Sequence, residues 1–374
     1  MAQRRLALER HLDNKLPDAI DNARLFAGSA GESPSKYSRS PDMWNAAFLE
    51  LGIDAAYVPF DVRSENLSAF LTEVREQPGF IGGNVTVPHK LAIMKLLDII
   101  DPIAQQIGAV NTYARQENGL LIGSNSDADG LLGSMLRTMP GESVPFLESL
   151  GGKRILLLGA GGAGRAAGFA LGSKLDGGTL TITNRSMDRA LELAAQVSQT
   201  YSGITAIDQV ESLSLLPEID IVVNASTVGQ SGIRHLPNDK ITCLEPFSSL
   251  VPANPALIDE TDDQVAFYRE FNEKSQAAIE HNNTESAHAI ATCRAGTTFI
   301  DAVYSPDETT MLKHAREAGF KTLNGKGMLV MQAAESFIKR MARPHLIEAG
   351  YDPDTLYDRV LSTMATAFDA SGSA

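Results

Sequence analysis

Short apolar runs alternate with helical patterns along most of the chain. Runs typical of buried strands occupy 23–28, 56–62 and 81–87, and apolar residues at helical spacing occupy 43–51 and 67–76. Further strand-like runs lie at 108–113, 120–122, 154–158, 180–183, 219–223 and 301–304, and further helical patterns at 91–97, 165–171 and 262–281. Such alternation of strands and helices predicts an α/β fold.

A glycine-rich turn lies between the strand at 154–158 and the helix at 165–171. It reads GAGGAG, a GxGxxG pattern in the strand–turn–helix context of a dinucleotide site. Glycines let the backbone approach a pyrophosphate, whose negative charge is favoured at a helix N-terminus. We therefore predict cofactor contacts along the whole turn. Its residues are Gly159, Ala160, Gly161, Gly162, Ala163 and Gly164.

The end of the next strand distinguishes between nicotinamide cofactors. NAD-specific sites usually carry an acid there, which binds the ribose hydroxyls. This chain has Asn184, Arg185 and Ser186, followed by Arg189. Two arginines without an acid suit a 2′-phosphate and favour NADP over NAD, although Arg189 on a solvated helix start is the alternative. The strand at 219–223 ends in small residues that we expect beside the nicotinamide or its ribose. They are Asn224, Ala225 and Ser226.

A polar strand end stands out in the first third of the chain. In the segment NVTVPHK, Pro88 stops the strand, because proline cannot donate to a sheet ladder. Asn84 and Thr86 share one strand face and lead to Lys90. By itself the segment fits either an ordinary strand with a solvated lysine or a small-molecule site.

Two serines precede the helical pattern at 43–51. Ser40 could cap this helix, with Pro41 at the first helical position. The hydroxyls of Ser38 and Ser40 could instead hold a substrate carboxylate. The two roles are compatible, since a helix N-terminus also binds anions.

Composition excludes several classes of partner. A formal net charge of −14 argues against nucleic acid, and no apolar run is long enough to span a bilayer. The two cysteines, Cys243 and Cys293, indicate no disulfide framework, so we expect a cytoplasmic protein. His281 and His288 share one helix face, but two histidines without a third ligand do not indicate a metal site.

The motifs together resemble the shikimate dehydrogenase family, which includes the quinate/shikimate dehydrogenases. None is decisive alone, but their shared order covers nearly the whole chain. They are SRSP at 38–41, NVTVPHK at 84–90, GAVNT at 108–112, NSDADG at 125–130, the glycine turn, NRS at 184–186, DAVY at 301–304 with Pro306, and GKGMLVMQAA at 325–334.

The resemblance implies a two-domain α/β fold. An N-terminal α/β substrate-binding and catalytic domain would comprise 1–127, joined by last helices that return over 326–374. A C-terminal Rossmann NADP-binding domain would span 128–325. The part around 230–298 is longer than the family norm, and we interpret it as an insertion, either a lid or an oligomer contact.

The resemblance also implies the reaction and its residues. The family reversibly reduces 3-dehydroshikimate to shikimate with NADP, a step towards chorismate and the aromatic amino acids. Lys90 and Asp127 would flank the reacting oxygen, with Lys90 either a proton donor or a fixed cation. The implied substrate-binding residues are Ser38, Ser40, Asn84, Thr86, Asn111, Tyr304 and Gln332, and Ala302 and Gly325 join the cofactor set.

Several residues depart from the family pattern. Tyr37 replaces the usual histidine, Ser126 the usual threonine, and Ala302 a larger apolar residue beside the nicotinamide. A quinate-preferring enzyme that uses NAD and a non-catalytic metabolite sensor are the alternatives. The arginines and Ser40 disfavour the first, and the presence of Lys90 with Asp127 disfavours the second. We expect a monomer or a homodimer.

Overall fold

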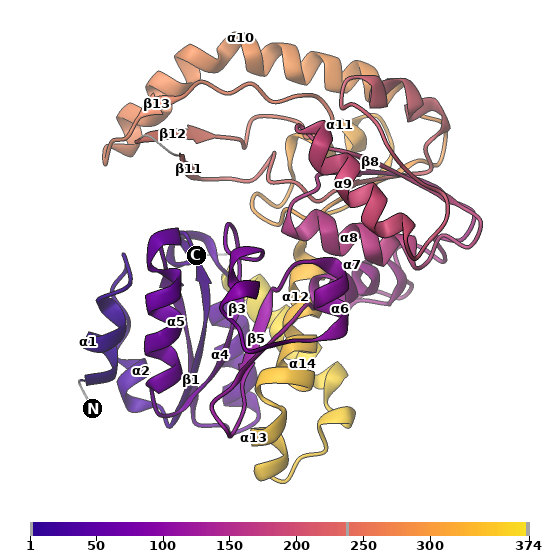
Figure 1. The fold of residues 1–374 in the computed structure, drawn as a ribbon. Helices are drawn as coiled ribbons and strands as arrows, with labels where there is room; N and C mark the ends of the chain where they lie inside the picture. The colour runs from indigo at the N-terminus through magenta and orange to yellow at the C-terminus, as the bar shows by residue number, and fades with distance from the viewer. Residues whose placement is uncertain (1–2, 237–238, 372–374) are drawn as a thin grey trace. The chain divides into compact units, whose positions relative to one another are not determined.

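The computed structural model describes residues 3–236 and 239–371 (Figure 1). The chain forms two compact units, one made of Met1–Pro145 with Gly327–Ala374 and the other of Phe146–Lys326. The boundary expected after residue 127 therefore lies after Pro145. The reason is that helix α7 (Asp127–Leu136) packs closely on α12 (Lys326–Ser336), which belongs mainly to the first unit.

The first unit contains a mixed six-stranded sheet in the order β2-β1-β3-β5-β6-β4. Strand β1 pairs in parallel with β2 and β3, whereas β5 runs antiparallel to β3 and β6. The strands are β1 (Leu25–Gly31), β2 (Ala55–Asp61), β3 (Phe80–Val85), β4 (Ile99–Ile100), β5 (Thr112–Arg115) and β6 (Leu121–Ser124). The longer helices are α4 (Ser40–Glu50), α5 (Leu67–Glu76), α7, α12 and α14 (Tyr357–Ser371). Shorter helical segments are α1 (Gln3–Glu9), α2 (Ala19–Asn22), α3 (Pro34–Tyr37), α6 (Pro102–Ile107) and α13 (Arg343–Glu348), with a π-helical turn at Phe337–Met341.

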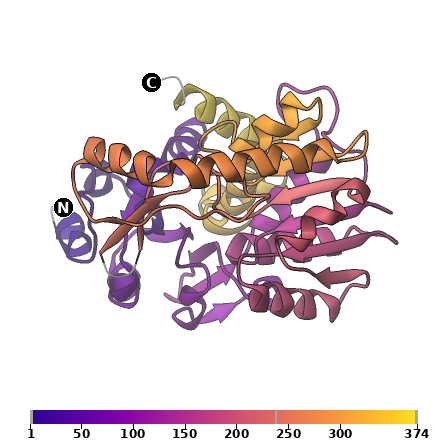
Figure 2. The same cartoon turned by 90° about the horizontal axis from the view of Figure 1, so that it is seen from above.

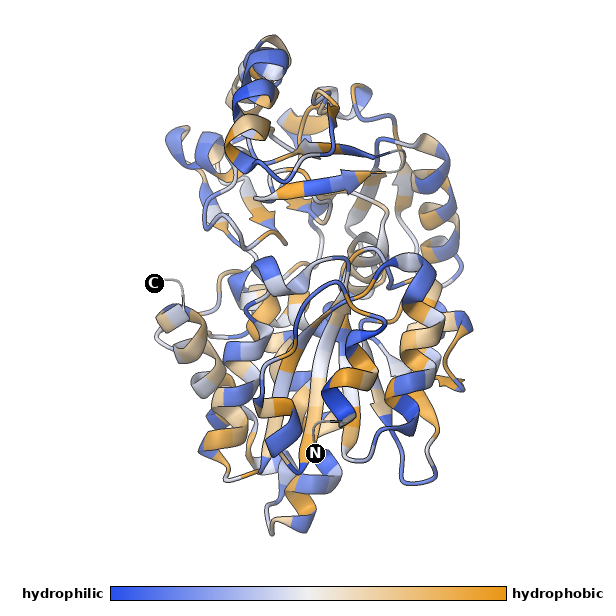
Figure 3. Ribbon diagram, turned by 90° about the vertical axis from the view of Figure 1, so that its left-hand side faces the viewer, coloured by the Kyte–Doolittle hydropathy of each residue, from blue (hydrophilic) through white to orange (hydrophobic). Residues whose placement is uncertain are grey.

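Helices cover both faces of this sheet. The apolar face of α5 enters a core cluster with Val58 and Phe60 of β2. Tyr57 points to the opposite face, because strand side chains alternate, and there it stacks on Trp44 of α4 at a centroid distance of 4.8 Å. Figure 3 shows both hydrophobic and hydrophilic residues along the helices, as expected for helices that cover a sheet.

The second unit contains a parallel six-stranded sheet in the order β15-β14-β10-β7-β8-β9. This is the doubly wound arrangement that the alternating pattern predicts. The strands are β7 (Arg154–Leu158), β8 (Thr179–Thr183), β9 (Ile204–Ala206), β10 (Ile221–Asn224), β14 (Thr298–Asp301) and β15 (Lys321–Leu323). The helices are α8 (Gly162–Gly172), α9 (Met187–Ser198), α10 (Gln264–Ala291) and α11 (Thr310–Glu317).

The expected insertion forms a small subdomain of the second unit. Antiparallel strands β11 (Ile233–Leu236), β12 (Lys240–Cys243) and β13 (Ile258–Asp259) make a three-stranded sheet, and α10 lies along it (Figure 2). Phe267 and Phe271 of α10 form a core with residues of this sheet. The other end of α10 places Ile290 in the core of the parallel sheet. The segment that we interpreted as an insertion is therefore packed into the second unit along the length of α10.

Several predicted elements have other bounds than those observed. The strand expected at 108–113 lies at Thr112–Arg115, and the helix expected at 262–281 extends to Ala291. The strand expected at 301–304 lies at 298–301, because Val303 N donates to Asp301 Oδ1 (2.9 Å) and the chain turns there. The strand expected to reach residue 87 ends at Val85, and the helix expected at 91–97 is a single 3₁₀ turn. Among the described residues no helix is long and apolar enough to cross a membrane.

Candidate active site

Lys90 and Asp127 meet in the first unit. Lys90 Nζ lies 2.6 Å from Asp127 Oδ2, and the two side chains are only 15% and 6% exposed. Lys90 follows the turn after β3, whereas Asp127 is the first residue of α7. The pairing expected from the sequence is therefore present. It sets a cation and a carboxylate in a largely desolvated place, where both act more strongly than in water.

Asn111 holds the carboxylate of this pair in position. Its Nδ2 donates to Asp127 Oδ1 (2.8 Å) and to Ser126 Oγ (3.0 Å), and its Oδ1 accepts from Ser126 N (2.8 Å). The side chain is 2% exposed. We expected Asn111 to contact substrate. Because both ends of its amide are already engaged, its geometry fits positioning of Asp127 instead.

Helix α12 contributes two further polar groups. Gln332 Oε1 accepts from Ser126 Oγ (3.2 Å) and from Asn111 Nδ2 (3.3 Å). Ser336 Oγ lies 2.8 Å from Ser126 Oγ and 2.9 Å from Thr112 Oγ1. Gln332 was expected at the site, but Ser336 was missed. A helical serine carries no sequence signal until α12 is known to pack here.

Gly130 makes this helix contact possible. A Cβ at this position would lie 2.7 Å from Met328 O and 2.8 Å from Gln332 Cβ. Only glycine therefore allows α7 and α12 to approach so closely. The final glycine of the NSDADG motif thus brings Gln332 to Ser126, which lies 206 residues earlier in the chain.

Asn84 belongs to the same buried network. Tyr57 OH donates to Asn84 Oδ1 (2.7 Å), and Asn84 Nδ2 donates to Thr112 Oγ1 (3.0 Å). Burial raises the pKa of Tyr57 well above its usual value, so the phenol stays a neutral donor. The amide of Asn84 therefore ties together β2, β3 and β5. This geometry fits a supporting role rather than the substrate contact that we expected.

The two serines lie at the start of α4. The helix begins at Ser40, and the N-cap residue is Arg39, which makes no side-chain capping bond. The expectation that Ser40 caps the helix is therefore wrong. Ser38 Oγ instead accepts from Ser40 N (3.2 Å), and nearby Tyr37 OH lies 3.4 Å from Thr86 Oγ1. This end of β3 thus adjoins the serine loop.

Asp61 holds the segment that leads to these serines. Its Oδ1 accepts from Ser35 N (2.8 Å), and its Oδ2 accepts from Ser35 Oγ. Burial raises the pKa of Asp61, while these two hydrogen bonds oppose the shift. No sequence pattern indicates this role, because an aspartate at the end of β2 fits many local structures.

The glycine turn of the second unit has the geometry of a pyrophosphate cradle. Gly159 has φ +109°, and a Cβ there would lie 2.8 Å from Ser226 N. A Cβ at Gly164 would lie 2.2 Å from Gly159 O. By contrast, no atom lies within 4 Å of a Cβ built at Gly161, the N-cap of α8. The turn is thus tight against the protein at both ends and open in the middle, which fits a dinucleotide.

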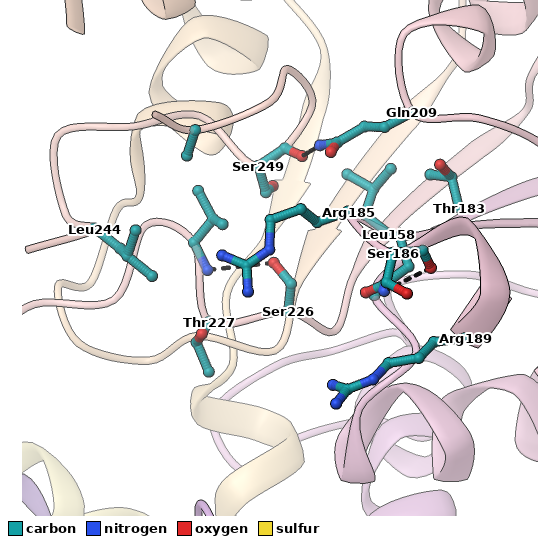
Figure 4. Close-up of a pocket in the computed structure, with 14 residues that line it drawn as sticks. Leu158, Thr183, Arg185, Ser186, Arg189, Gln209, Ser226, Thr227, Leu244 and Ser249 are labelled. Carbon is teal, nitrogen blue, oxygen red and sulfur yellow. Dashed lines mark hydrogen bonds between the residues drawn. The ribbon is translucent and has the colours of Figure 1, made fainter. Parts of the chain in front are cut away.

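A cavity of about 360 Å³ adjoins this turn (Figure 4). Arg185 and Arg189 line it, together with Ser186 and Ser226. Both arginines are exposed, and their side chains make no hydrogen bond or ion pair within residues 3–236 and 239–371. They are therefore available to an anionic ligand. Asn184 also has an internal role, since its Oδ1 accepts from Ala160 N (3.2 Å).

A buried amide and carboxyl support the other side of the pocket. Asn224 Oδ1 accepts from Ser226 N (2.9 Å), and Asn224 Nδ2 donates to Asp301 Oδ1 (2.8 Å). Thr309 Oγ1 donates to Asp301 Oδ2 (2.8 Å). Burial raises the pKa of Asp301 to about 7. Asn224 is fully buried, so its geometry fits positioning of Ser226 rather than the cofactor contact that we expected, and the part played by Asp301 was missed.

The remaining predicted residues lie after β14 in the second unit. Gly325 N donates to Val303 O (2.9 Å), and a Cβ at Gly325 would lie 2.2 Å from Ala302 O. Ala302 and Gly325 are thus adjacent, as a shared site requires. Tyr304 belongs to this unit, whereas the other predicted substrate residues belong to the first. In the described part of the chain no three His, Cys, Asp or Glu side chains gather as a metal site would require.

Comparisons with known proteins match parts of both units. A model described as the shikimate dehydrogenase substrate binding domain matches residues 32–113, and one described as shikimate / quinate 5-dehydrogenase matches residues 144–237. A shikimate dehydrogenase (NADP(+)) of Shouchella clausii (strain KSM-K16) is 33% identical over 305 residues, covering 81% of this chain and 88% of the relative. One of Geobacter sp. (strain M21) is 34% identical over 308 residues, covering 81% and 86%.

A solved structure has the same fold. The shikimate 5-dehydrogenase of Thermus thermophilus, in complex with NADP(H) and shikimate, is 28% identical to this chain. The match has a TM-score of 0.60 and covers 93% of this chain and 99% of that one. The likeness thus extends over both units.

Proposed function

Because the chain belongs to the shikimate dehydrogenase family, we propose that it catalyses the reversible NADP-dependent reduction of 3-dehydroshikimate to shikimate. The single observation that carries this proposal is the Lys90–Asp127 pair, with its 2.6 Å separation and low exposure. A metabolite sensor would not need a desolvated ion pair, whereas a carbonyl reduction needs a group that stabilises or protonates the forming alkoxide.

The second unit would hold the cofactor. The open backbone at Gly161 and the N-terminus of α8 suit the pyrophosphate, and Arg185 with Arg189 suits a 2′-phosphate. When bound, NADP supplies the hydride acceptor and NADPH the hydride donor. No acid that could bind the ribose hydroxyls in the manner of an NAD site follows β8 before Asp188, so the residues fit NADP better than NAD.

Lys90 would act on the substrate oxygen. During reduction, negative charge develops on the former carbonyl oxygen, and an ammonium beside it can donate a proton or stabilise the charge. Asp127 would hold this ammonium in place through its 2.6 Å contact. Asn111 would in turn keep Asp127 oriented through its 2.8 Å bond. In the reverse direction, the neutral amine that this proton donation leaves on Lys90 would accept the hydroxyl proton.

The remaining groups would orient the substrate. Ser38 and Ser40 would bind its carboxylate, and Thr86 a ring hydroxyl. Gln332 donates one Nε2 hydrogen to Leu329 O (3.0 Å) and would bind a ring hydroxyl through the second. The substrate contact expected of Tyr304 stays a prediction. We assign Asn84 and Asn111 to the support of this arrangement, because their amides are occupied by protein groups at both ends.

Initial rates of nicotinamide reduction test the proposal. They are measured with shikimate or quinate as substrate and NADP or NAD as cofactor, in all four combinations. We expect the highest kcat/KM for shikimate with NADP. The highest value for quinate with NAD would identify the quinate-preferring alternative. No turnover in any combination, together with binding of shikimate, would identify a sensor.

A further inference from the structure

The inserted segment contributes a wall to the nucleotide pocket. Leu244, Ser249 and Ala253 line the cavity together with Arg185 and Arg189. Figure 4 shows Leu244 on one side of the pocket and Ser186 and Arg189 on the other. These wall residues lie beyond residues 144–237, which match the family model. The wall is therefore a feature of this chain that the matched motifs do not describe.

A single buried amide on α10 holds this wall. Asn282 Oδ1 accepts from Ser248 N (2.8 Å). Its Nδ2 donates to Ser248 O (3.2 Å) and Val251 O (3.0 Å), with Pro252 O at 3.4 Å. Asn282 is 1% exposed. One side chain thus fixes both ends of the turn from Ser248 to Pro252.

Further bonds fix the same turn from other sides. Ser286, one helical turn after Asn282, donates from Oγ to Ser248 Oγ (2.7 Å). Gln209, which also lines the pocket, donates from Nε2 to Ser249 O (3.1 Å). Gly229 N donates to Leu244 O (3.0 Å), which joins the wall to the loop after β10. These hydrogen bonds therefore fix the position of the wall relative to the rest of the pocket.

We infer that the inserted segment positions the cofactor. Leu244, Ser249 and Ala253 form the surface that contacts the adenine base of the dinucleotide, and Asn282 is the residue that positions this surface. The inference rests on the proposed function. This wall suits a flat base, because one apolar side chain and two small side chains face the pocket. The arginines that line the same pocket would bind the phosphate. It gives the insertion a purpose other than a lid or an oligomer contact.

Titration calorimetry with NADP alone, on the full chain, tests the inference. The Asn282→Ala variant frees the turn that carries the wall, and we expect NADP to bind about tenfold more weakly, the equivalent of roughly one buried hydrogen bond. In steady-state rates the KM for NADP should rise similarly, while kcat and the KM for shikimate stay near wild type. His281→Ala is the matched control, because it removes an exposed neighbour on the same helix.

A second variant tests the wall without disturbing its support. Ala253→Leu adds bulk to the pocket surface and leaves every bond of Asn282 intact, so it applies even if Asn282→Ala fails to fold. We expect several-fold weaker NADP binding. Because Ala253 also packs against the buried cluster that contains Phe247 and Phe267, a cooperative thermal unfolding transition verifies that the variant folds. Ala291→Leu makes the same change at an exposed position at the end of α10 and should bind NADP like wild type.

The outcomes separate this inference from the proposed function. Wild-type protein that does not bind NADP would contradict the proposed function. If the wild-type protein binds NADP and Ala253→Leu binds it with equal affinity, the inferred role of the wall is overturned and the proposed function is not. A folded Asn282→Ala variant that binds NADP with wild-type affinity would overturn the positioning role. So would a folded variant in which kcat falls while the KM values for NADP and for shikimate both rise.

Discussion

The two units contain the same buried arrangement of an amide, a serine and an aspartate, with one difference. In the first unit, Asn111 bonds to Ser126 N and to Asp127, at 2.8 Å each. In the second, Asn224 bonds to Ser226 N at 2.9 Å and to Asp301 at 2.8 Å. Asp127 also faces the ammonium of Lys90, whereas among described residues Asp301 accepts only from neutral donors.

This difference separates a site for chemistry from a support. A carboxylate that pairs with a cation in a desolvated place keeps that cation oriented. Burial disfavours the charged form of a carboxyl that has only neutral donors. This raises the pKa of Asp301 to about 7. Arg185 and Arg189 of the second unit, which form no ion pair with any described residue, are instead exposed and line the pocket. We therefore expect the reacting groups in the first unit and the anion-binding groups in the second.

Removing the cation should have the largest effect. Lys90→Ala leaves Asp127 with neutral donors, like Asp301, and removes the group beside the forming alkoxide. We expect kcat to fall by about 10²–10⁴-fold, with a much smaller change in the KM for shikimate. Lys95→Ala, an exposed lysine nearby in sequence, is the control in the same rate assay. Equal changes in kcat and KM would contradict a transition-state role for Lys90.

Removing Arg185 and Arg189, the two exposed cations that line the pocket of the second unit, should affect the cofactor only. For the double variant Arg185→Ala and Arg189→Ala we expect the KM for NADP to rise roughly 10–100-fold, because two charge-assisted contacts to phosphate are lost. The KM for NAD should change little. The control, Lys313→Ala, removes an exposed charge from the same unit. An equal rise in the KM values for NADP and NAD would mean that the arginines do not recognise the 2′-phosphate.

The hydroxyl network behind Asn111 should contribute to stability. Ser336→Ala deprives the Ser126 and Thr112 hydroxyls of a shared buried partner, and we expect a loss of about 1–2 kcal/mol in the free energy of unfolding. Urea denaturation measures it. Ser362→Ala changes an exposed serine of the same unit and should be neutral within about 0.5 kcal/mol. Equal stability of the two variants would count against the network.

A separate prediction concerns the dependence of stability on pH. The pKa of Asp301 is about 7 in the folded protein and near 3.8 when unfolded, so the folded state binds more protons between these values. Stability from this group is complete below pH 3.8 and is lost as pH rises towards 7, at no more than about 1.4 kcal/mol per pH unit.

Asp301→Asn should remove this dependence. An amide imitates the protonated carboxyl, because its oxygen can accept from Asn224 and its nitrogen can donate to Thr309 Oγ1. Thermal unfolding between pH 4 and 8 should therefore show a flatter profile for the variant than for wild type. Asp307→Asn, an exposed aspartate six residues later, is the control. Parallel profiles for wild type and Asp301→Asn would contradict the raised pKa.

Local patterns in the sequence determined the class of fold and indicated the nucleotide pocket. Alternating strands and helices predicted the α/β units, and the glycine turn with Arg185 and Arg189 predicted the nucleotide pocket. These features depend on residues a few positions apart, so period, turn residues and charge suffice to read them. The Lys90–Asp127 pair followed from family motifs, because 37 residues separate its members.

Only the tertiary structure decided which polar groups do the supporting. Ser336, Asp301 and Asn282 acquire their roles from packing between distant elements, and a hydroxyl, carboxyl or amide has the same local sequence signal whether it is solvated or buried. The same cause explains the reassigned amides. The sequence places Asn84 and Asn111 at strand ends, but only the packed neighbours reveal that both of their hydrogen-bonding ends are already occupied.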